Sequence, residues 1–327
     1  MSEDQIVQIY RERFGLGEDA RNDVEAMRMG NRLLVSKVDT LVYGTDVPPG
    51  MTPRKAARKA AVACISDFAA KGVRPRWALV SITAPASCTS RTHGAMAAGL
   101  ADAADAYGFK VLGGDTNRGA EISITVCMMG MAKGIFPRRD APADRPGYWK
   151  RPPSVPSRGG ASPGDRVLAT GPFGLSAAGL YAVSHGVAGP RGSLRAVMEP
   201  RARLNFGARA APYLSSTMDS SDGLSTTLNE MAARSGVAII VDCDPAAAGV
   251  AEFAAKHGLD PDDLVYHGGE EYEIVFTLRR GGINDIFSAI RDTRIPLTPI
   301  GRVEEGEGVY LERDGRTRLF DEGWKAF

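Results

Sequence analysis

The stretch PRRDAPADRPGYWKRPPSVPSRGGASP, residues 137–163, divides the sequence into two parts. Its prolines and glycines cannot sustain a helix or a sheet, and its many basic residues make it too polar to pack as a core. On each side, helical and strand-like segments alternate, which is typical of α/β domains. The sequence therefore predicts a two-domain α/β protein, with a first domain at residues 1–150 and a second at residues 151–327.

The first part of the chain shows this alternation in its periodicity and its turn residues. Helices are expected at residues 4–14, 54–72 and 90–107. Glycine favours the left-handed conformation that closes a helix, so Gly72 and Gly108 are the expected stops of the second and third helix. The expected strands are residues 32–38, WALVSITAP at 77–85, KVLGG at 110–114 and EISITVCMMGMA at 121–132.

Beyond the proline-rich stretch, a second α/β set is expected. Its predicted helices are residues 173–186, 200–211, 222–235 and 246–257. Its predicted strands are DRVLATG at 165–171, TMD at 217–219, VAIIVD at 237–242, YEIVFTL at 272–278 and short strands around residues 297–312.

Length and composition restrict the class of protein. With 327 residues, of which 43% are hydrophobic, the chain is long enough for two cores. A net charge of +1 gives no overall field that would recruit nucleic acid. No apolar run approaches the roughly 20 residues of a membrane helix, and residues 1–15 are too charged for a signal peptide. We expect a cytoplasmic protein without a nucleic-acid or membrane partner.

Acidic residues stand at or near the ends of apolar runs at Asp23, Asp39, Asp67, Asp115, Asp219, Asp222 and Glu270. A carboxylate beside a buried element is costly to desolvate unless a cation compensates it. Mg²⁺ prefers carboxylate oxygens and is commonly held against phosphate groups. The pattern therefore indicates an ATP-dependent enzyme that uses Mg²⁺. We expect the fold to bring the aspartates that end such runs to one groove, in particular Asp39, Asp67, Asp115 and Asp219.

Three motifs contain several of these acids, and each also has a purely structural interpretation. GGDTNRG at 113–119 could approach a phosphate through its backbone amides, or it could be a tight turn with a solvated aspartate. DSSDGL at 219–224 could hold a metal ion, or Asp222 or Ser221 could cap the helix that follows. Capping explains only one of its two aspartates. GGEEYEIVF at 268–276 could be a glycine turn that leads into an edge strand.

Motifs of other nucleotide-binding enzymes are absent from the sequence. It contains no GxxxxGK[ST] loop, no GxGxxG after the first strand, and no HRD or DFG pair. Its four histidines stand in no recognisable spacing for a base or a metal ligand. These absences argue against a P-loop enzyme, a Rossmann dehydrogenase and a protein kinase.

Taken together, the motifs resemble those of one family. GGDTNRG, SDGL and GGEEYE occur with the helix end ISDFAAKGVRPRWALVSITAP, the phrase SRGGASPGD and the C-terminal GWKAF. Their order and spacing are similar to those of the thiamine-monophosphate kinases, a family in the superfamily that also contains aminoimidazole-ribonucleotide synthetase. The similarity runs from about residue 15 to residue 327.

The resemblance implies a fold, a reaction and cofactors. The implied fold is the two-domain aminoimidazole-ribonucleotide synthetase-like fold, α/β (α+β). In this fold the N-terminal sheet pairs with that of a second subunit to close a barrel, so a homodimer is expected. ATP and several Mg²⁺ ions would bind in the groove between the domains. The implied reaction transfers a phosphoryl group from ATP to the phosphate of thiamine monophosphate, giving thiamine diphosphate and ADP.

The resemblance also implies roles for individual residues. Positions that bind Mg²⁺ in the family match Asp23, Asp39, Asp67, Asp115, Asp219 and Asp222. Three of these are the expected catalytic residues: Asp115, Asp219 and Asp222. Positions that bind the nucleotide match Gly114, Asp115, Arg158 and Ser221. Positions on the substrate side match Asp46, Glu270 and Trp324.

Three features depart from the family pattern and concern the substrate more than the reaction class. Lys37 stands in a segment where bacterial enzymes commonly carry a Ser-Thr pair, so it either alters metal coordination or contacts phosphate directly. Asp46 stands where those enzymes have a histidine. Residues 137–156 form an expected insertion, which is either a solvated surface loop or a mobile flap whose arginines approach the triphosphate.

A phosphate acceptor would explain a site rich in carboxylates and poor in histidines. The acceptor oxygen is already anionic near neutral pH, so the enzyme needs no general base. The difficulty is repulsion between two phosphate groups, which Mg²⁺ ions and accurate positioning offset. A hydroxyl acceptor would suit such a site less well.

Two alternative functions stay open at this stage. The first is another ATP-dependent enzyme of the superfamily that acts on a different small molecule. Selenophosphate synthetase would require a reactive N-terminal cysteine and the hydrogenase maturation factor a C-terminal one, and both are absent. The second is a noncatalytic nucleotide-binding protein, against which the presence of all the expected metal-binding aspartates argues.

Overall fold

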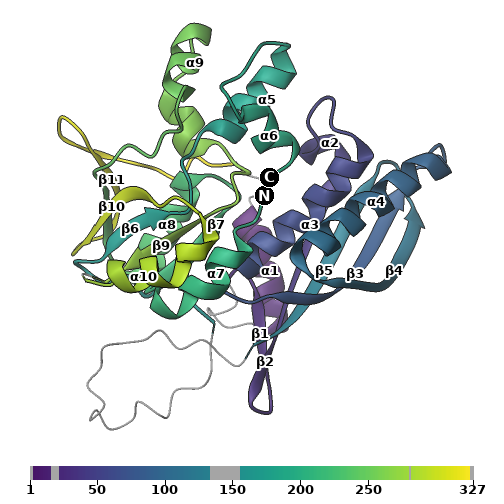
Figure 1. The fold of residues 1–327 in the computed structure, drawn as a ribbon, viewed down its shortest axis with the longest axis horizontal. Coiled ribbons are helices and arrows are strands. Elements are labelled where there is room, and N and C mark those ends of the chain that lie inside the picture. The colour runs from purple at the N-terminus through teal and green to yellow at the C-terminus, as the bar shows by residue number, and fades with distance from the viewer. Residues whose placement is uncertain (1–2, 16–21, 133–154, 280, 325–327) are drawn as a thin grey trace.

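In a computed structural model of the chain, the residues that the structure describes are 3–15, 22–132, 155–279 and 281–324. The predicted domain boundary between residues 150 and 151 lies outside these ranges. The expected insertion at residues 137–156 also lies outside them, except for its last two positions. The described residues form two α/β domains, each built on a mixed sheet (Figure 1).

The N-terminal domain contains a five-stranded sheet in the order β1-β2-β5-β3-β4. Strands β3 and β4 run parallel, and the other neighbours are antiparallel. In β5 buried residues alternate with less buried ones, which is the pattern of a strand with one face on a core. The strands are β1 (Glu25–Met29), β2 (Arg32–Val42), β3 (Pro75–Ala84), β4 (Lys110–Arg118) and β5 (Ser123–Ala132).

Two long helices lie on one side of this sheet, α3 (Pro53–Ala70) and α4 (Ser90–Tyr107) (Figure 1). Helix α3 begins at a proline, which needs no backbone donor in the first turn, and Thr52 caps it by accepting a backbone hydrogen bond. Thr89 caps α4 in the same way. Gly108 ends α4 with a φ of +75°, a conformation that favours glycine. The short helix α2 (Tyr43–Asp46) follows β2.

The C-terminal domain contains a seven-stranded sheet in the order β12-β11-β8-β10-β6-β9-β7. Its strands are β6 (Arg166–Ala169), β7 (Ser216–Ser220), β8 (Ala238–Val241), β9 (Glu273–Leu278), β10 (Thr298–Glu304), β11 (Gly308–Glu312) and β12 (Arg316–Arg318). Its helices are α5 (Leu175–His185), α6 (Ser193–Met198), α7 (Leu204–Ala210), α8 (Leu224–Ser235), α9 (Val250–His257) and α10 (Ile283–Ile290). Single turns occupy Ala211–Tyr213, Asp263–His267 and Arg291–Thr293. Every residue of β7, β8 and β9 is buried, as expected for strands covered on both faces.

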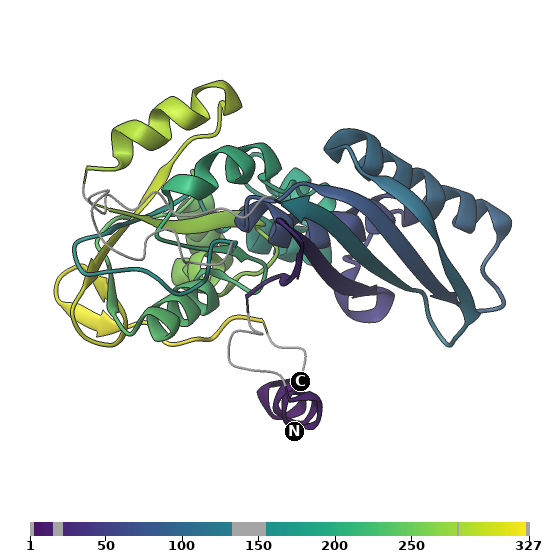
Figure 2. The ribbon, with the colours of Figure 1, turned by 90° about the horizontal axis from the view of Figure 1, so that it is seen from below.

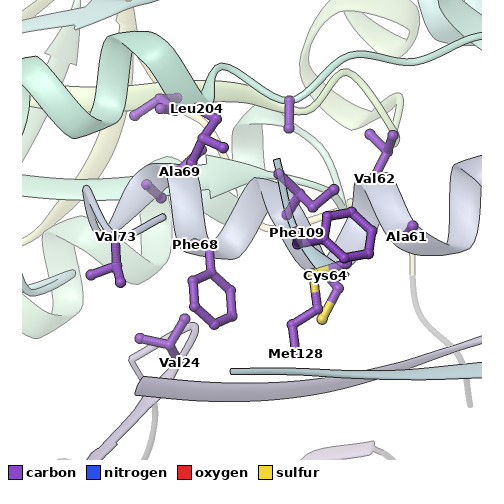
Figure 3. Close-up of a cluster of buried hydrophobic side chains, with 14 of the residues drawn as sticks. Val24, Ala61, Val62, Cys64, Phe68, Ala69, Val73, Phe109, Met128 and Leu204 are labelled. Carbon is purple, nitrogen blue, oxygen red and sulfur yellow. The ribbon is translucent and has the colours of Figure 1, made fainter. Parts of the chain in front are cut away.

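Helix α3 joins the two domains through one shared hydrophobic core. Most of its buried apolar side chains form a single cluster with residues of both domains. Figure 3 shows Phe68 on the side of the helix that faces Val24 and Met128, whereas Leu204 of the C-terminal domain lies near Ala69 on the opposite side. The position of α3 therefore fixes how the two sheets face each other.

The predicted elements are largely confirmed. Helix α4 has the predicted bounds, and β5 covers most of the predicted strand at 121–132. The structure adds β1, α2, α6, α10 and β12, which the sequence did not predict. Strand β4 continues to Arg118, so most of GGDTNRG lies in a strand and not in the tight turn that was one of its two interpretations. Pairing with β3 explains this extension, since the register continues from Val80 opposite Gly114 to Ala84 opposite Arg118.

Helix α1 (Glu3–Phe14), predicted at residues 4–14, stands apart from the two sheets (Figure 2). Its exposed apolar side chains include Ile9, Tyr10 and Phe14. Across the ranges that the structure describes, none of the helices combines the length and the apolar character that crossing a membrane would require.

Gly207 of α7 tests the contact between α3 and the C-terminal domain. A Cβ at this position would lie 1.7 Å from the carbonyl oxygen of Ala69, so Gly207→Ala must force the two helices apart. We expect it to destabilise the protein by about 1–3 kcal/mol, the usual cost of overpacking. Thermal unfolding followed by circular dichroism measures the effect.

Gly94 provides the matched control, because it also lies in a helix but a Cβ there meets nothing within 4 Å. Gly94→Ala should leave stability unchanged or raise it by about 0.5–1 kcal/mol through helix propensity. Equal effects of the two substitutions would contradict the close contact between α3 and α7.

Candidate active site

Three aspartates from distant parts of the chain meet beside helix α3. Asp23 precedes β1, Asp67 lies in α3 and Asp219 lies in β7, and all three are buried. One carboxylate oxygen of each lies within 4.8 Å of the other two. Oxygen ligands in this arrangement suit a hard cation such as Mg²⁺, so the side chains fit the ion that the sequence predicts. We call these three residues the carboxylate cluster.

Three cationic side chains pack against the carboxylate cluster. The Lys71 ammonium lies 2.8 Å from Asp23 Oδ2, and neither side chain is exposed to solvent. The Arg158 guanidinium also pairs with Asp23. The Lys37 ammonium lies 2.9 Å from Asp67 Oδ2. Because an unpaired buried charge is strongly destabilising, these ion pairs allow the cluster to exist inside the protein.

Burial and neighbouring charges shift the pKa values of the cluster in different directions. Burial alone would raise the pKa of Asp23, but Lys71 and Arg158 lower it below its ordinary value. Burial, together with the charge of Asp23, raises the pKa of Asp219 to about 6. Burial also raises the pKa of Asp67 well above its ordinary value, although Lys37 opposes this shift. A bound cation would favour the ionised form of both raised acids.

A cavity of about 670 Å³ opens beside the carboxylate cluster. Asp39 connects the cavity with the cluster. It lines the cavity, and it interacts electrostatically with Lys37, the ion-pair partner of Asp67. Six of the residues predicted from the sequence line this cavity: Asp39, Asp46, Ser221, Asp222, Glu270 and Trp324. Residues separated by most of the chain length therefore face one space, which has the size of a small-molecule site.

Backbone hydrogen bonds hold the C-terminal walls of the cavity together. The Glu270 amide donates to the Ser221 carbonyl oxygen at 2.6 Å, and the Trp324 amide donates to the Asp222 carbonyl oxygen at 2.9 Å. Glu270 has a φ of +65° and Tyr272 a φ of +53°, which are strained values for side-chain-bearing residues. Such strain persists only where the surroundings enforce it, and it is concentrated at functional sites.

Lys59 of α3 connects the two residues expected on the substrate side. Its side chain is 2% exposed and pairs with the Glu270 carboxylate. Its ammonium also donates to the Asp46 carbonyl oxygen at 2.5 Å. The Asp46 carboxylate accepts a hydrogen bond from the Val42 amide at 2.7 Å, so it stabilises the turn after β2 as well as lining the cavity. Burial raises the pKa of Glu270, with Lys59 acting against that shift.

Gly114 and Asp115 lie on strand β4, at the exposed edge of the N-terminal sheet. Within the described part of the chain, the carboxylate cluster does not include Asp115, whose carboxylate accepts a hydrogen bond from Asn117 at 2.7 Å. A Cβ at Gly114 would lie 1.6 Å from the Val80 carbonyl oxygen. The pairing of β3 with β4 therefore requires this glycine, whatever it contributes to phosphate binding.

Comparisons with known proteins identify the family of the chain. Residues 21–132 match the family model described as AIR synthase related protein, N-terminal domain, and residues 162–314 match the corresponding C-terminal domain. The chain is 39% identical over 332 residues to the thiamine-monophosphate kinase of Nitrosopumilus maritimus (strain SCM1), covering 100% of this chain and 99% of that protein. The chain belongs to the thiamine-monophosphate kinase family.

Other members of the thiamine-monophosphate kinase family show the same full-length similarity. The chain is 33% identical over 329 residues to the enzyme of Pyrococcus horikoshii, covering 99% of this chain and 96% of that protein. Among solved structures, AaThiL complexed with AMPPCP and TMP superposes with a TM-score of 0.84 at 26% identity, covering 100% of this chain and 97% of that chain. Both domains of the present chain therefore have counterparts in these relatives.

Several residues at the site of the present chain were not predicted from the sequence. Lys59 and Lys71 are buried, which is rare for lysine. The one hint of this in the sequence is that both stand near Asp67 in the same alanine-rich helical segment. Tyr181 and His185 of α5 line the cavity, and their rings stack with centroids 3.9 Å apart. Their spacing of four residues places both on one face of a helix, but it does not reveal what that face meets.

We expect Mg²⁺ to bind more weakly to the ligand-free protein as the pH falls through about 6. Protons compete with the ion for Asp219, whose pKa burial raises to about 6, so each binding event should release more protons at lower pH. Isothermal titration calorimetry in buffers of different ionisation enthalpy measures both quantities.

Asp102→Asn is the control for this titration. Asp102 is an exposed acid paired with Arg54 on the protein surface, so its loss should change neither the affinity nor the proton release. Magnesium binding that does not depend on pH between about 5 and 8 would contradict the assignment of the carboxylate cluster.

Proposed function

We propose that the protein transfers the γ-phosphoryl group of ATP to the phosphate of thiamine monophosphate, giving thiamine diphosphate and ADP. The observation that carries this proposal is the cavity lined by Asp39, Asp222, Glu270 and Trp324 beside a carboxylate cluster. It is supported by full-length similarity to thiamine-monophosphate kinases and by a relative whose structure holds AMPPCP and TMP.

The carboxylate cluster would hold Mg²⁺ through Asp23, Asp67 and Asp219, and Asp39 and Asp222 add two further carboxylates on the cavity wall. When bound, Mg²⁺ supplies the positive charge that offsets repulsion between donor and acceptor phosphates. The side chains of the cavity then have to bind and orient the two substrates. Removal of a proton from the acceptor is unnecessary, because a phosphate monoester is already anionic near neutral pH.

The cavity provides groups suited to a cationic, aromatic acceptor. The thiazolium ring of thiamine carries a positive charge, which favours contact with carboxylates and with the faces of aromatic rings. Asp46 and Glu270 supply carboxylates, and Trp324 and Tyr181 supply rings. The Trp324 side chain is 53% exposed, so it can still bury area on a ligand. We therefore assign these residues to acceptor binding.

We place the nucleotide near Ser221 and Arg158 and assign Asp115 to its phosphates. Arg158 already lies against the carboxylate cluster through Asp23, and Ser221 lines the cavity two residues after Asp219. Gly114 and Asp115 lie on strand β4, whose residues are all exposed and therefore accessible to a ligand or a partner. A role for Asp115 follows from its match to the family motif, and substitution tests it.

Asp219→Asn should lower kcat for ADP release with thiamine monophosphate by at least about 100-fold, the usual loss when a preorganised electrostatic group is removed. If Asp115 acts on the phosphates, Asp115→Asn should have an effect of similar size, about 3 kcal/mol in transition-state stabilisation. A coupled assay of ADP release and chromatographic detection of thiamine diphosphate measure both.

Asp102→Asn should keep full activity, since Asp102 lies on the exterior in a pair with Arg54. A panel of related phosphates and alcohols should be tested in parallel, because another acceptor would indicate a different enzyme of the superfamily. Near-normal turnover of Asp219→Asn would reject the metal assignment, and nucleotide binding without any turnover would favour a noncatalytic protein.

We further propose that the chain forms a homodimer through the open face of its N-terminal sheet. Val38 and Leu79 are both in register with Cys127, so all three point to the same face, opposite the helices. Val38 is 59% exposed and Leu79 is 42% exposed, while Leu112 on the edge strand is 55% exposed. A contiguous apolar sheet face of this kind usually marks an interface.

Two glutamates on this face should prevent association. We expect the protein with both Val38→Glu and Leu79→Glu to be a monomer in light scattering, because burying two carboxylates without partners is strongly unfavourable. The wild-type protein should be a dimer at micromolar concentration. The matched control carries Ala97→Glu and Ala101→Glu on the exposed face of α4 and should stay dimeric. A wild-type monomer would reject the interface.

A further inference from the structure

Lys37 occupies an unusual position among acidic groups. It lies on strand β2, two residues before Asp39, and its ammonium is 2.9 Å from Asp67 Oδ2. Its side chain is 26% exposed and that of Asp67 is 9% exposed, so water screens this pair only in part. The positive charge of Lys37 also acts on Asp39 and Asp219. One lysine therefore faces three acids that the family resemblance assigns to magnesium.

The cations near these acids are unevenly distributed. In the described part of the chain, Asp23 forms ion pairs with both Lys71 and Arg158, whereas the ion pair of Asp67 is with Lys37. Arg158 also pairs with Glu230 at 3.5 Å, so the charges of Lys71 and Arg158 are matched by those of Asp23 and Glu230. Lys37 is thus the cation that compensates the charge of Asp67 when no metal ion is bound.

We propose that Lys37 is a built-in cation that takes the place of one divalent ion in the carboxylate cluster, so that the ligand-free site keeps its arrangement without magnesium. The inference rests on the proposed magnesium-dependent function. An ammonium within hydrogen-bond distance of a carboxylate oxygen supplies positive charge where a metal ion would otherwise be needed. Because it is attached to β2, it is present at any magnesium concentration.

This role has consequences that differ from those of a lysine that only binds a substrate phosphate. Removal of the Lys37 charge should leave Asp67 without its ion-pair partner and weaken the positive charge that acts on Asp39 and Asp219 in the ligand-free protein. The folded state should then become less stable in the absence of metal, and magnesium should bind more tightly and restore the stability. A lysine reserved for phosphate would leave the metal-free protein unaffected and would change only the Michaelis constant for a substrate.

The test compares wild type with Lys37→Met and Lys37→Gln, which remove the charge but keep much of the side-chain length. Thermal unfolding is measured in EDTA and in millimolar magnesium, and calorimetry gives the magnesium affinity. We expect both variants to melt lower than wild type in EDTA and to regain most of the difference in magnesium. Their magnesium affinity should rise at least about tenfold, since a repelling charge has been removed.

Two further variants separate charge from packing. Lys37→Arg keeps the positive charge and should behave as wild type in EDTA. Lys55→Met removes an exposed lysine paired with Glu199 and should not alter the response to magnesium. Equal magnesium responses of Lys37→Met and wild type would overturn the inference. Failure of both uncharged variants to fold even with magnesium would also overturn it, because the metal ion should replace the missing charge.

These readouts do not involve thiamine monophosphate, so they are independent of the proposed reaction. If wild type releases no ADP with this acceptor but magnesium still rescues Lys37→Met, the proposed function fails and the role of Lys37 stands. If the enzyme is active but the rescue is absent, the role of Lys37 fails and the function stands.

Discussion

The buried ion pair between Lys71 and Asp23 is the contact on which the arrangement of the site depends. Lys71 is the C-cap residue of α3, and neither it nor Asp23 has an exposed side chain. The same ammonium donates to the Thr217 carbonyl oxygen at 2.7 Å, two residues before Asp219. Burial lowers the pKa of Lys71, and Asp23 acts against that shift. Because removal of Asp23 would leave the buried Lys71 ammonium without its ion-pair partner, this junction holds α3, β7 and the segment before β1 in one arrangement.

A second constraint comes from the backbone of the loop before β9. Of the four residues other than glycine with positive φ in the described chain, three lie at the site: Asp23, Glu270 and Tyr272. Glu270 is held by a backbone bond to Ser221 and by the ion pair with Lys59. The loop therefore depends on helix α3 of the other domain for its conformation. The carboxylate cluster and the cavity are thus both positioned by helix α3, which explains how two domains can form one site.

Much of this arrangement could be predicted from the sequence where the signal is local. The helix at 90–107 has a capping threonine before it and Gly108 after it, and its bounds were predicted correctly. The motifs with paired glycines and acids identified residues that do converge on the cavity, such as Asp222 and Glu270, although their convergence follows from the family resemblance and not from their spacing.

Other features depend on contacts between distant segments, which no local pattern encodes. Lys59 and Lys71 resemble the exposed lysines of any amphipathic helix, and only the opposing Glu270 and Asp23 make their burial possible. Strand β4 continues past Gly114 because β3 provides a partner for pairing, whereas the local glycines favour a turn. Tertiary pairing thus overrides the local preference at the point where the motif lies.

The two histidines at the cavity each contact a neighbouring residue through Nδ1. A hydroxyl acceptor needs a general base, which a histidine or a carboxylate can provide, whereas a phosphate acceptor needs none. His185 has its Nδ1 2.9 Å from the Tyr181 carbonyl oxygen and stacks on the Tyr181 ring. His267 has its Nδ1 3.0 Å from Ser225 Oγ, and its Nε2 lies 3.7 Å from Glu322. Both rings are thus held by local partners, whereas the carboxylates and lysines face the cavity and the cluster beside it. A site built from charges that balance one another suits a reaction whose main obstacle is repulsion between anions, and the transfer of a phosphoryl group to a phosphate is such a reaction.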